Sequence, residues 1–131
     1  MIVLDTHVLI WNIFFPDKLT KEAKNIILNE LDAEGTLYYS SISIWEIGIK
    51  FKKKHIIFPA PFNEFITMLD ETKDFVEIPT DKDIYLKAAM FDWEHKDPAD
   101  RIIVATALVN DATLVTADEV LHDRYSKCVW K

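Results

Sequence analysis

Four acidic residues lie at points where the sequence predicts that a strand ends or a helix begins. They are Asp5, Glu46, Asp100 and Asp118. Asp5 and Asp118 each follow a short apolar run that is typical of a buried strand, while Glu46 and Asp100 each fall in the first turn of a predicted helix. If the fold brings these carboxylates together, they could hold a divalent cation that activates a water molecule.

The same acids have a simpler interpretation as helix caps. Acidic side chains are favoured in the first turn of any helix, where they accept from free N–H groups and face the positive end of the dipole. Asp97 could be the N-cap of a helix that starts at Pro98, with Asp100 as its reciprocal acid. Asp5 fits a cap less well, because the neighbouring Thr6 hydroxyl could cap that helix without a charge.

Repulsion between close carboxylates separates the two interpretations. Two carboxylates about 4 Å apart repel by about 4 kcal/mol at an effective dielectric constant of 20. A group of three or four must therefore keep protons, with raised pKa values, or hold a cation. Oxygen ligands alone suit Mg²⁺ or Mn²⁺ and not zinc. Such ions, held by a few carboxylates, are the chemistry of phosphodiester hydrolysis.

The elements that must position these acids alternate along the chain. The predicted strands are residues 2–4, 37–40, 75–78, 113–116 and 127–130. The predicted helices are residues 7–15, 20–35, 43–55, 62–69, 80–91, 98–109 and 117–125. This alternation predicts an α/β fold, a three-layer α/β/α sandwich with a central parallel sheet of about five strands. In such a fold the turns from strand to helix share the carboxyl edge of the sheet, where the four acids could meet.

The composition fits a single folded domain over residues 1–131. Half of the residues are hydrophobic and glycine occurs only twice, which argues against disorder. No apolar run reaches the roughly 18 residues of a membrane span, and the N-terminus lacks the basic region of a secretory signal. The single cysteine, Cys128, suits a reducing cytoplasm. The formal net charge of −7 argues against a general nucleic-acid coat, so any contact with nucleic acid must be local.

Four motifs spread over essentially the whole chain resemble those of the PIN-domain family. They are Leu4-Asp-Thr-His7, Ser41-Ile-Ser-Ile-Trp-Glu46, His95-Lys-Asp-Pro-Ala-Asp-Arg101 and Leu114-Val-Thr-Ala-Asp118. The resemblance is closest to the small VapC-type toxins of prokaryotic toxin–antitoxin pairs. It implies a cytoplasmic endoribonuclease that depends on Mg²⁺ or Mn²⁺, is neutralised by a bound antitoxin protein, and forms a homodimer.

The resemblance also implies roles for individual residues. The implied metal ligands and catalytic groups are Asp5, Glu46 and Asp100, with Asp118 as a more variable fourth acid. Two hydroxyl residues match positions that support the site through hydrogen bonds, namely Thr6 and Thr116. Asp97 matches a helix cap. Trp93-Glu94 replaces the Leu-Pro that relatives often have, a departure that leaves the acids intact.

Basic residues and histidines allow more than one interpretation. The dense basic run from Lys50 to His55 could complement the dipole at a helix C-terminus or contact RNA phosphates. The lysines considered for RNA contact are Lys50, Lys52 and Lys53. Arg101 could bind a phosphate or pair with a carboxylate. The four histidines show no metal-ligand spacing, and His7, next to Asp5, is expected to support the site or pack.

Two rival functions remain open at this point. A phosphatase or phosphoacceptor domain could use a similar sheet, although such a phosphatase usually has Asp-x-Asp after its first strand, and here Thr6 and His7 follow Asp5. A catalytically inactive PIN-like binding module would have the same fold. The intact Asp5, Glu46 and Asp100 argue against the inactive module without excluding it.

Overall fold

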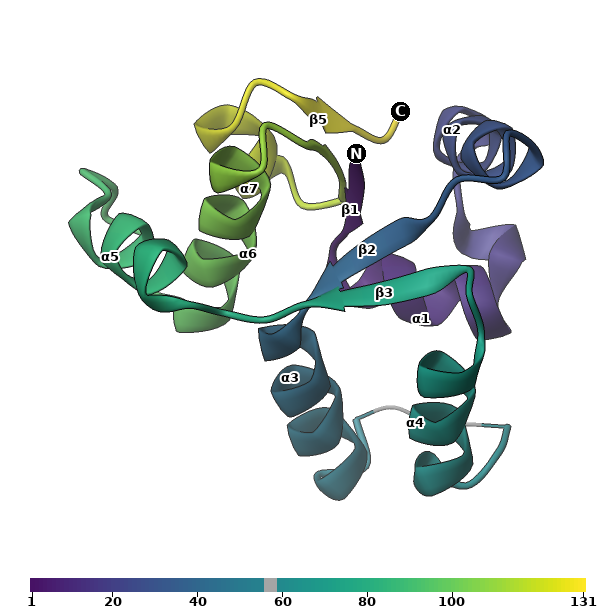
Figure 1. The fold of residues 1–131 in the computed structure, drawn as a ribbon. Helices are drawn as coiled ribbons and strands as arrows, with labels where there is room; N and C mark the ends of the chain where they lie inside the picture. Colours follow the sequence, from purple (N-terminus) through teal and green to yellow (C-terminus); the bar gives the residue numbers. More distant parts are fainter. Residues whose placement is uncertain (56–58) are drawn as a thin grey trace.

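The computed structural model describes residues 1–55 and 59–131. The strands in these ranges are β1 (Ile2–Leu4), β2 (Leu37–Ser40), β3 (Phe75–Ile78), β4 (Thr113–Val115) and β5 (Cys128–Val129). They form one parallel sheet in the order β3-β2-β1-β4-β5 (Figure 1). The central strand β1 pairs Val3 with Tyr38 on one side and with Leu114 on the other. The predicted parallel sheet of about five strands is confirmed.

Helices cover both faces of this sheet, as successive residues of β1 show. Ile2 and Leu4 pack into one hydrophobic cluster and Val3 into another, because neighbouring side chains of a strand point to opposite faces. The described helices are α1 (Thr6–Phe14), the 3₁₀ helix η1 (Pro16–Lys18), α2 (Lys21–Asp32), α3 (Ser41–Lys52), α4 (Phe62–Glu71), α5 (Lys82–Met90), α6 (Pro98–Val109) and α7 (Glu119–Arg124). None of them is long and apolar enough to cross a membrane.

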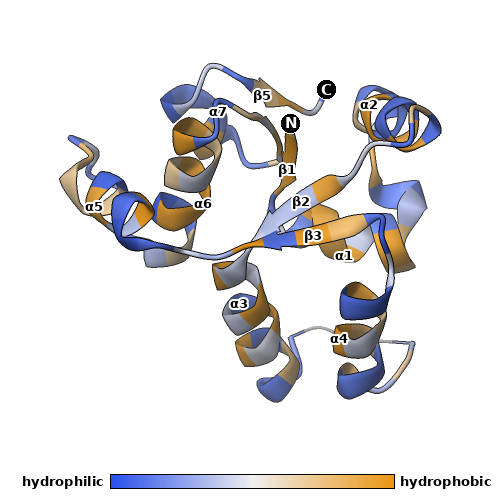
Figure 2. Ribbon diagram, in the orientation of Figure 1, coloured by the Kyte–Doolittle hydropathy of each residue, from blue (hydrophilic) through white to orange (hydrophobic). Residues whose placement is uncertain are grey.

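α6 begins and ends where the sequence predicts. Asp97 is its N-cap and accepts hydrogen bonds from the backbone N–H groups of Ala99 and Asp100, while Pro98 takes the first helical position. Residues 102–107 are all buried. Apolar residues, orange in Figure 2, concentrate on β1 and along α6. The buried body of α6 thus anchors its first turn, which carries Asp100, against the sheet.

α3 begins at Ser41, two residues before the predicted start at Ser43. The N-cap is Ser40, whose hydroxyl accepts from the backbone N–H of Ile42. Ser43 is not a cap but lies inside the helix, where its hydroxyl contacts the Thr6 hydroxyl at 2.8 Å. Glu46 therefore belongs to the second turn of α3 and not to the first.

Four other helices, α1, α2, α5 and α7, also start one or two residues from the predicted position, and α1 and α5 show why. α1 starts at Thr6, because Asp5 accepts from the Thr6 backbone N–H. α5 is capped by Asp81 and not by Thr80, since the Asp81 carboxylate accepts from the backbone N–H of Ile84. In each case a side chain next to the expected cap satisfies the free N–H groups of the first turn.

Candidate functional site

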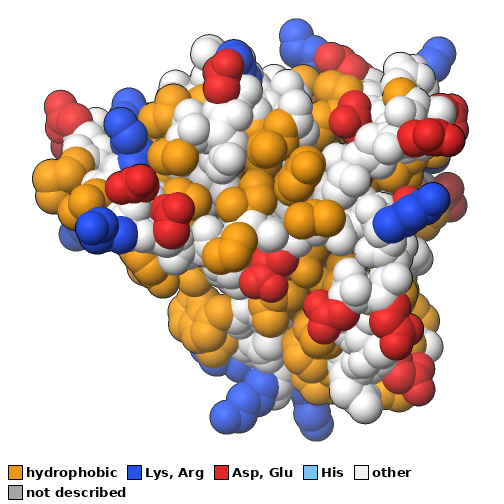
Figure 3. Space-filling model, viewed as in Figure 1, with side chains coloured by type: hydrophobic (Ala, Val, Ile, Leu, Met, Phe, Trp, Pro, Cys, Tyr) orange, Lys and Arg blue, Asp and Glu red, His pale blue; other side chains and the backbone are white. Residues whose placement is uncertain are grey.

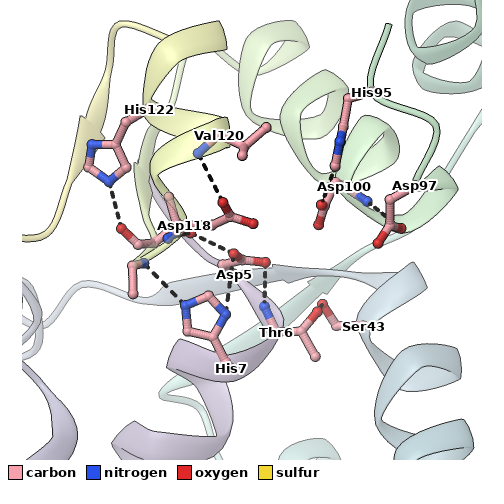
Figure 4. A network of polar contacts seen from close by, with 12 residues as sticks. Asp5, Thr6, His7, Ser43, His95, Asp97, Asp100, Asp118, Val120 and His122 are labelled. Carbon is pink, nitrogen blue, oxygen red and sulfur yellow. Dashed lines mark hydrogen bonds and ion pairs between the residues drawn. The ribbon is translucent and has the colours of Figure 1, made fainter.

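Asp5 is buried at the end of β1, and both of its carboxylate oxygens have partners (Figure 4). The Thr6 backbone N–H donates to Oδ1 at 2.8 Å, and the Thr116 hydroxyl donates to Oδ2 at 2.6 Å. His7 Nδ1 lies 3.5 Å from the same Oδ2. The fold therefore fixes the direction in which the Asp5 carboxylate points.

His7 supports Asp5 through its ring. The backbone N–H of Ala117 donates to His7 Nε2 at 3.1 Å. A ring nitrogen that accepts a hydrogen bond carries no proton, so the proton of the neutral imidazole lies on Nδ1, facing Asp5. His7 thus links Asp5 to the segment that leads to Asp118, which is the supporting role expected for it.

Thr116 joins the first and last acids of the sequence. Its hydroxyl donates to Asp5 and accepts from the backbone N–H of Asp118 at 3.0 Å. Its carbonyl oxygen accepts from His122 Nε2 at 2.7 Å. Asp118 in turn caps α7, with Oδ1 accepting from the backbone N–H of Val120 at 2.9 Å. Thr6 contributes its backbone N–H to Asp5, whereas its hydroxyl contacts Ser43 on α3.

Asp100 faces the same edge from the first turn of α6 (Figure 4). Its Oδ2 lies 2.7 Å from Nε2 of His95, and its side chain is 14% exposed. The pKa of Asp100 is raised to about 6. Burial is the largest cause, the hydrogen bond from His95 acts in the opposite direction, and the charges of Asp97, Asp5 and Asp118 add to the increase. Three other carboxylates therefore act on Asp100 across this edge of the sheet.

Glu46, on α3, has no hydrogen bond to these acids among the described residues. It lies one turn beyond Ser43 on α3, and its Oε1 is buried without a hydrogen-bond partner among the described residues. A buried carboxylate oxygen without a partner is costly, by about 1–3 kcal/mol or more. Bound cations remove such a cost, so the Glu46 oxygen fits a position that ligates a metal ion.

The tightest candidate group differs from the predicted set of four acids. Within the described part of the chain, the only set of three or more possible ligands whose atoms all lie within 4.8 Å of one another is His95, Asp97 and Asp100. This group includes His95, which its spacing in the sequence does not single out as a possible ligand. Sequence spacing missed His95 because the contact depends on how residues 91–97 fold back onto α6.

Arg101 contacts backbone carbonyl groups, and no ion pair joins it to a carboxylate among the described residues. Its guanidinium donates five hydrogen bonds, as many as it has N–H groups, and all of them go to backbone carbonyl oxygens of residues 88–95. It therefore serves as an internal clamp.

The lysine run lies at the other end of α3 from the sheet. Lys50 and Lys52 occupy the last helical turn and Lys53 is the C-cap, so they complement the negative end of the dipole. The 12 residues of α3 span about 18 Å. Figure 3 shows blue side chains at the lower end of the molecule, where Figure 1 places the end of α3.

The parallel α/β/α sandwich carries acidic side chains at the carboxyl edge of its sheet, which places the protein among α/β proteins with an acidic edge. The PIN domain family model matches residues 2–127, and the chain belongs to this family. No curated protein sequence matches the chain.

Solved structures of other proteins share the fold. A chain of a toxin–antitoxin complex from Klebsiella pneumoniae is 23% identical with a TM-score of 0.67, and the match covers 98% of this chain and 96% of that one. FitAcB from Neisseria gonorrhoeae gives 21% identity, a TM-score of 0.61 and coverage of 100% and 97%. A chain of FitAB bound to an IR36 DNA fragment is 21% identical with a TM-score of 0.51, and the match covers 91% of this chain and 86% of that one. These likenesses extend over nearly the full length of each chain.

Proposed function

We propose that the protein is a metal-dependent endoribonuclease that acts as the toxin of a toxin–antitoxin pair. The observation that carries the proposal is the uncompensated charge at the acidic edge. The charges of Asp5 and Asp118 act on Asp100 there, and among the described residues no lysine or arginine forms an ion pair with these three acids. Membership of the PIN domain family and the likeness to a toxin–antitoxin complex support the same function.

The residues that would hold the metal are Asp5, Glu46, Asp100 and Asp118. Their oxygen ligands fit Mg²⁺ or Mn²⁺, and the buried, unpartnered oxygen of Glu46 fits such an ion on structural grounds. A bound ion of this kind supplies an activated water and neutralises charge on the phosphate. Thr116 and His7 hold Asp5 in a fixed direction, and His95 does so for Asp100, so that the carboxylates are preorganised.

Metal titration of RNA cleavage tests this proposal directly. The protein is incubated with a panel of single-stranded RNAs in chelator, Mg²⁺ or Mn²⁺, and product ends are mapped. Cleavage that requires Mg²⁺ or Mn²⁺ is expected. Failure to cleave with any divalent ion would favour the inactive binding module, and phosphate release from a small phosphate ester without RNA cleavage would favour the phosphatase.

RNA contact by the lysine run is a further part of the proposal. The net charge of −7 leaves Lys50, Lys52 and Lys53 as a local positive patch at the C-terminal end of α3, the helix that also carries Glu46. Changing all three to Gln should weaken RNA binding and reduce its dependence on salt, because fewer counterions are released. An unchanged salt dependence would remove the lysines from the RNA interface.

The partners we propose are an antitoxin over the acidic edge and a second copy of the chain. A basic antitoxin segment would complement the acids. For the second copy, a cavity of about 410 Å³ beside Pro98 is bordered by Trp45 and Tyr85, which are 58% and 55% exposed. Exposed aromatic patches of this kind mark protein interfaces. Light scattering should give a dimer for the wild type and a monomer for Trp45→Lys combined with Tyr85→Lys; a monomeric wild type at micromolar concentration would refute the dimer.

A further inference from the structure

The Arg101 side chain lies inside the connection between α5 and α6 and holds it together. It reaches back from the first turn of α6 to the end of α5 and to the chain that follows. The five acceptors, at 2.6 to 3.5 Å, are the carbonyl oxygens of Ala88, Ala89, Phe91, Trp93 and His95. Two of these carbonyls belong to the last residues of α5, where helix carbonyls lack intrahelical partners and favour a cation.

The chain from residue 91 to residue 95 has the alternation of an extended segment. Phe91, Trp93 and His95 are partly buried, whereas Asp92 and Glu94 are exposed. In an extended chain, alternate residues direct their backbone groups and their side chains to the same side. The carbonyl oxygens of the three partly buried residues therefore converge on one planar guanidinium.

His95 is held at both its backbone and its ring. Its carbonyl oxygen accepts from Arg101 Nη1 at 3.0 Å. Its ring lies 4.8 Å from the Trp93 ring, centroid to centroid, with an interplanar angle of 32°. From this position Nε2 reaches Asp100 Oδ2 at 2.7 Å (Figure 4). Arg101, His95 and Asp100 thus close a ring of contacts around the first turn of α6.

We propose that Arg101 is a positioning residue for Asp100 and acts through His95. The guanidinium fixes the backbone of His95, the ring of His95 fixes one oxygen of Asp100, and the other oxygen is left to face the acidic edge. The importance of this relay for catalysis rests on the proposed function, in which Asp100 binds a metal ion. Lysine could not replace Arg101, because an ammonium group has three donors and lacks the planar fork that meets five carbonyls.

A first test observes His95 in the metal-free, full-length protein. Nitrogen NMR of the imidazole in Arg101→Lys should show loss of the hydrogen bond between His95 and Asp100 that the wild type retains. Arg124→Lys is the matched control, since the Arg124 guanidinium also lies over Phe91, at 4.8 Å from its ring. An unchanged His95 signal in folded Arg101→Lys would overturn the proposal. So would unfolding of Arg101→Lys alone, because Arg101 would then only stabilise the fold.

A second test measures Mn²⁺ affinity by calorimetry in a double-mutant cycle. Arg101→Lys and His95→Ala should each lower the affinity by about 10–100-fold, the usual effect of losing an outer partner of a metal ligand. Combined, they should lose no more than His95→Ala alone, because both act through the same bond. Additive losses of Mn²⁺ affinity would overturn the proposal that Arg101 acts through His95. If even the wild type binds no Mn²⁺, the proposed function fails, and the His95 signal still decides the role of Arg101.

Discussion

Asp5 and Asp100 lie at the same edge of the sheet, but the fold holds them in different ways. Asp5 is 3% exposed, and its two oxygens accept from the Thr6 backbone N–H and the Thr116 hydroxyl. Asp100 is held by His95, which comes from a segment without regular secondary structure, and burial raises its pKa to about 6. One carboxylate is part of the hydrogen-bonded framework, whereas the other is charged at a cost in the folded protein.

This difference shows that two carboxylates at the same edge of the sheet can affect the stability of the fold in opposite directions. Both oxygens of Asp5 accept hydrogen bonds that the fold supplies, while burial and three like charges disfavour the charged form of Asp100. The same Asp→Asn substitution should therefore change stability in opposite directions at the two positions. A metal that binds both carboxylates would remove the cost at Asp100 and stabilise the folded state by mass action.

Asp5→Asn should have the largest effect. Loss of a proposed metal ligand should abolish RNA cleavage, while the chain stays folded. The metal-free protein should lose about 1–3 kcal/mol, because the Asn amide cannot accept from both the Thr6 N–H and the Thr116 hydroxyl. Cleavage assays and urea unfolding in chelator measure the two effects, with the exposed Asp92→Asn as control. Substantial activity in Asp5→Asn would contradict the assignment of this ligand.

Thr116→Val tests whether the Asp5 framework depends on one hydroxyl. Valine keeps the shape but leaves Asp5 Oδ2 without its donor and the Asp118 backbone N–H without its acceptor. The expected loss is about 1–3 kcal/mol, the usual cost of an unsatisfied buried group. Thr116→Ser keeps both hydrogen bonds and should lose less stability than Thr116→Val. Equal losses for the two variants would assign the effect to packing and not to the hydroxyl.

Asp100→Asn should stabilise the metal-free protein at pH 7, by about 1 kcal/mol or more, because it removes a charge that burial and neighbouring acids disfavour. It should also shrink the stabilisation gained on adding Mg²⁺. Melting curves of both proteins, in chelator and in Mg²⁺, measure the two effects. A destabilised variant with a full Mg²⁺ response would mean that Asp100 is only a helix cap.

The stability that Asp100→Asn gains over the wild type should become smaller as the pH falls. Because the pKa of Asp100 is about 6 in the folded protein and 3.8 is the ordinary value, the folded state retains a proton that the unfolded chain has lost between these values. The wild type therefore gains stability relative to Asp100→Asn as the pH falls from 7 to about 4. Urea unfolding of both proteins in chelator at several pH values measures this difference. A difference independent of pH would show that Asp100 does not titrate as described.

The contrast between the two acids also separates what the sequence predicts from what it does not. The sheet and the bounds of α6 follow from apolar runs and from Asp97-Pro98, which are local signals. The placement of Asp5 at a strand end is likewise local. The contacts of His95 and Arg101 depend on how residues 91–97 close onto α6, and the position of Glu46 depends on Ser40 taking the cap. Loop closure and the choice between adjacent caps involve small energy differences that residue patterns do not resolve.

Asp97 provides the smallest and most selective test, because it belongs to the close group with His95 and Asp100 and also caps α6. Asp97→Ser should cost only a few tenths of a kcal/mol, since serine is an equally good N-cap, whereas Asp97→Ala should cost about 1 kcal/mol. If Asp97 only caps, Asp97→Ser keeps the full Mg²⁺ stabilisation in melting curves; a reduced response would make Asp97 a ligand. Asp97→Ser removes the Asp97 charge and should therefore also lower the pKa of Asp100, because Asp97 is the nearby carboxylate with the largest effect on that group.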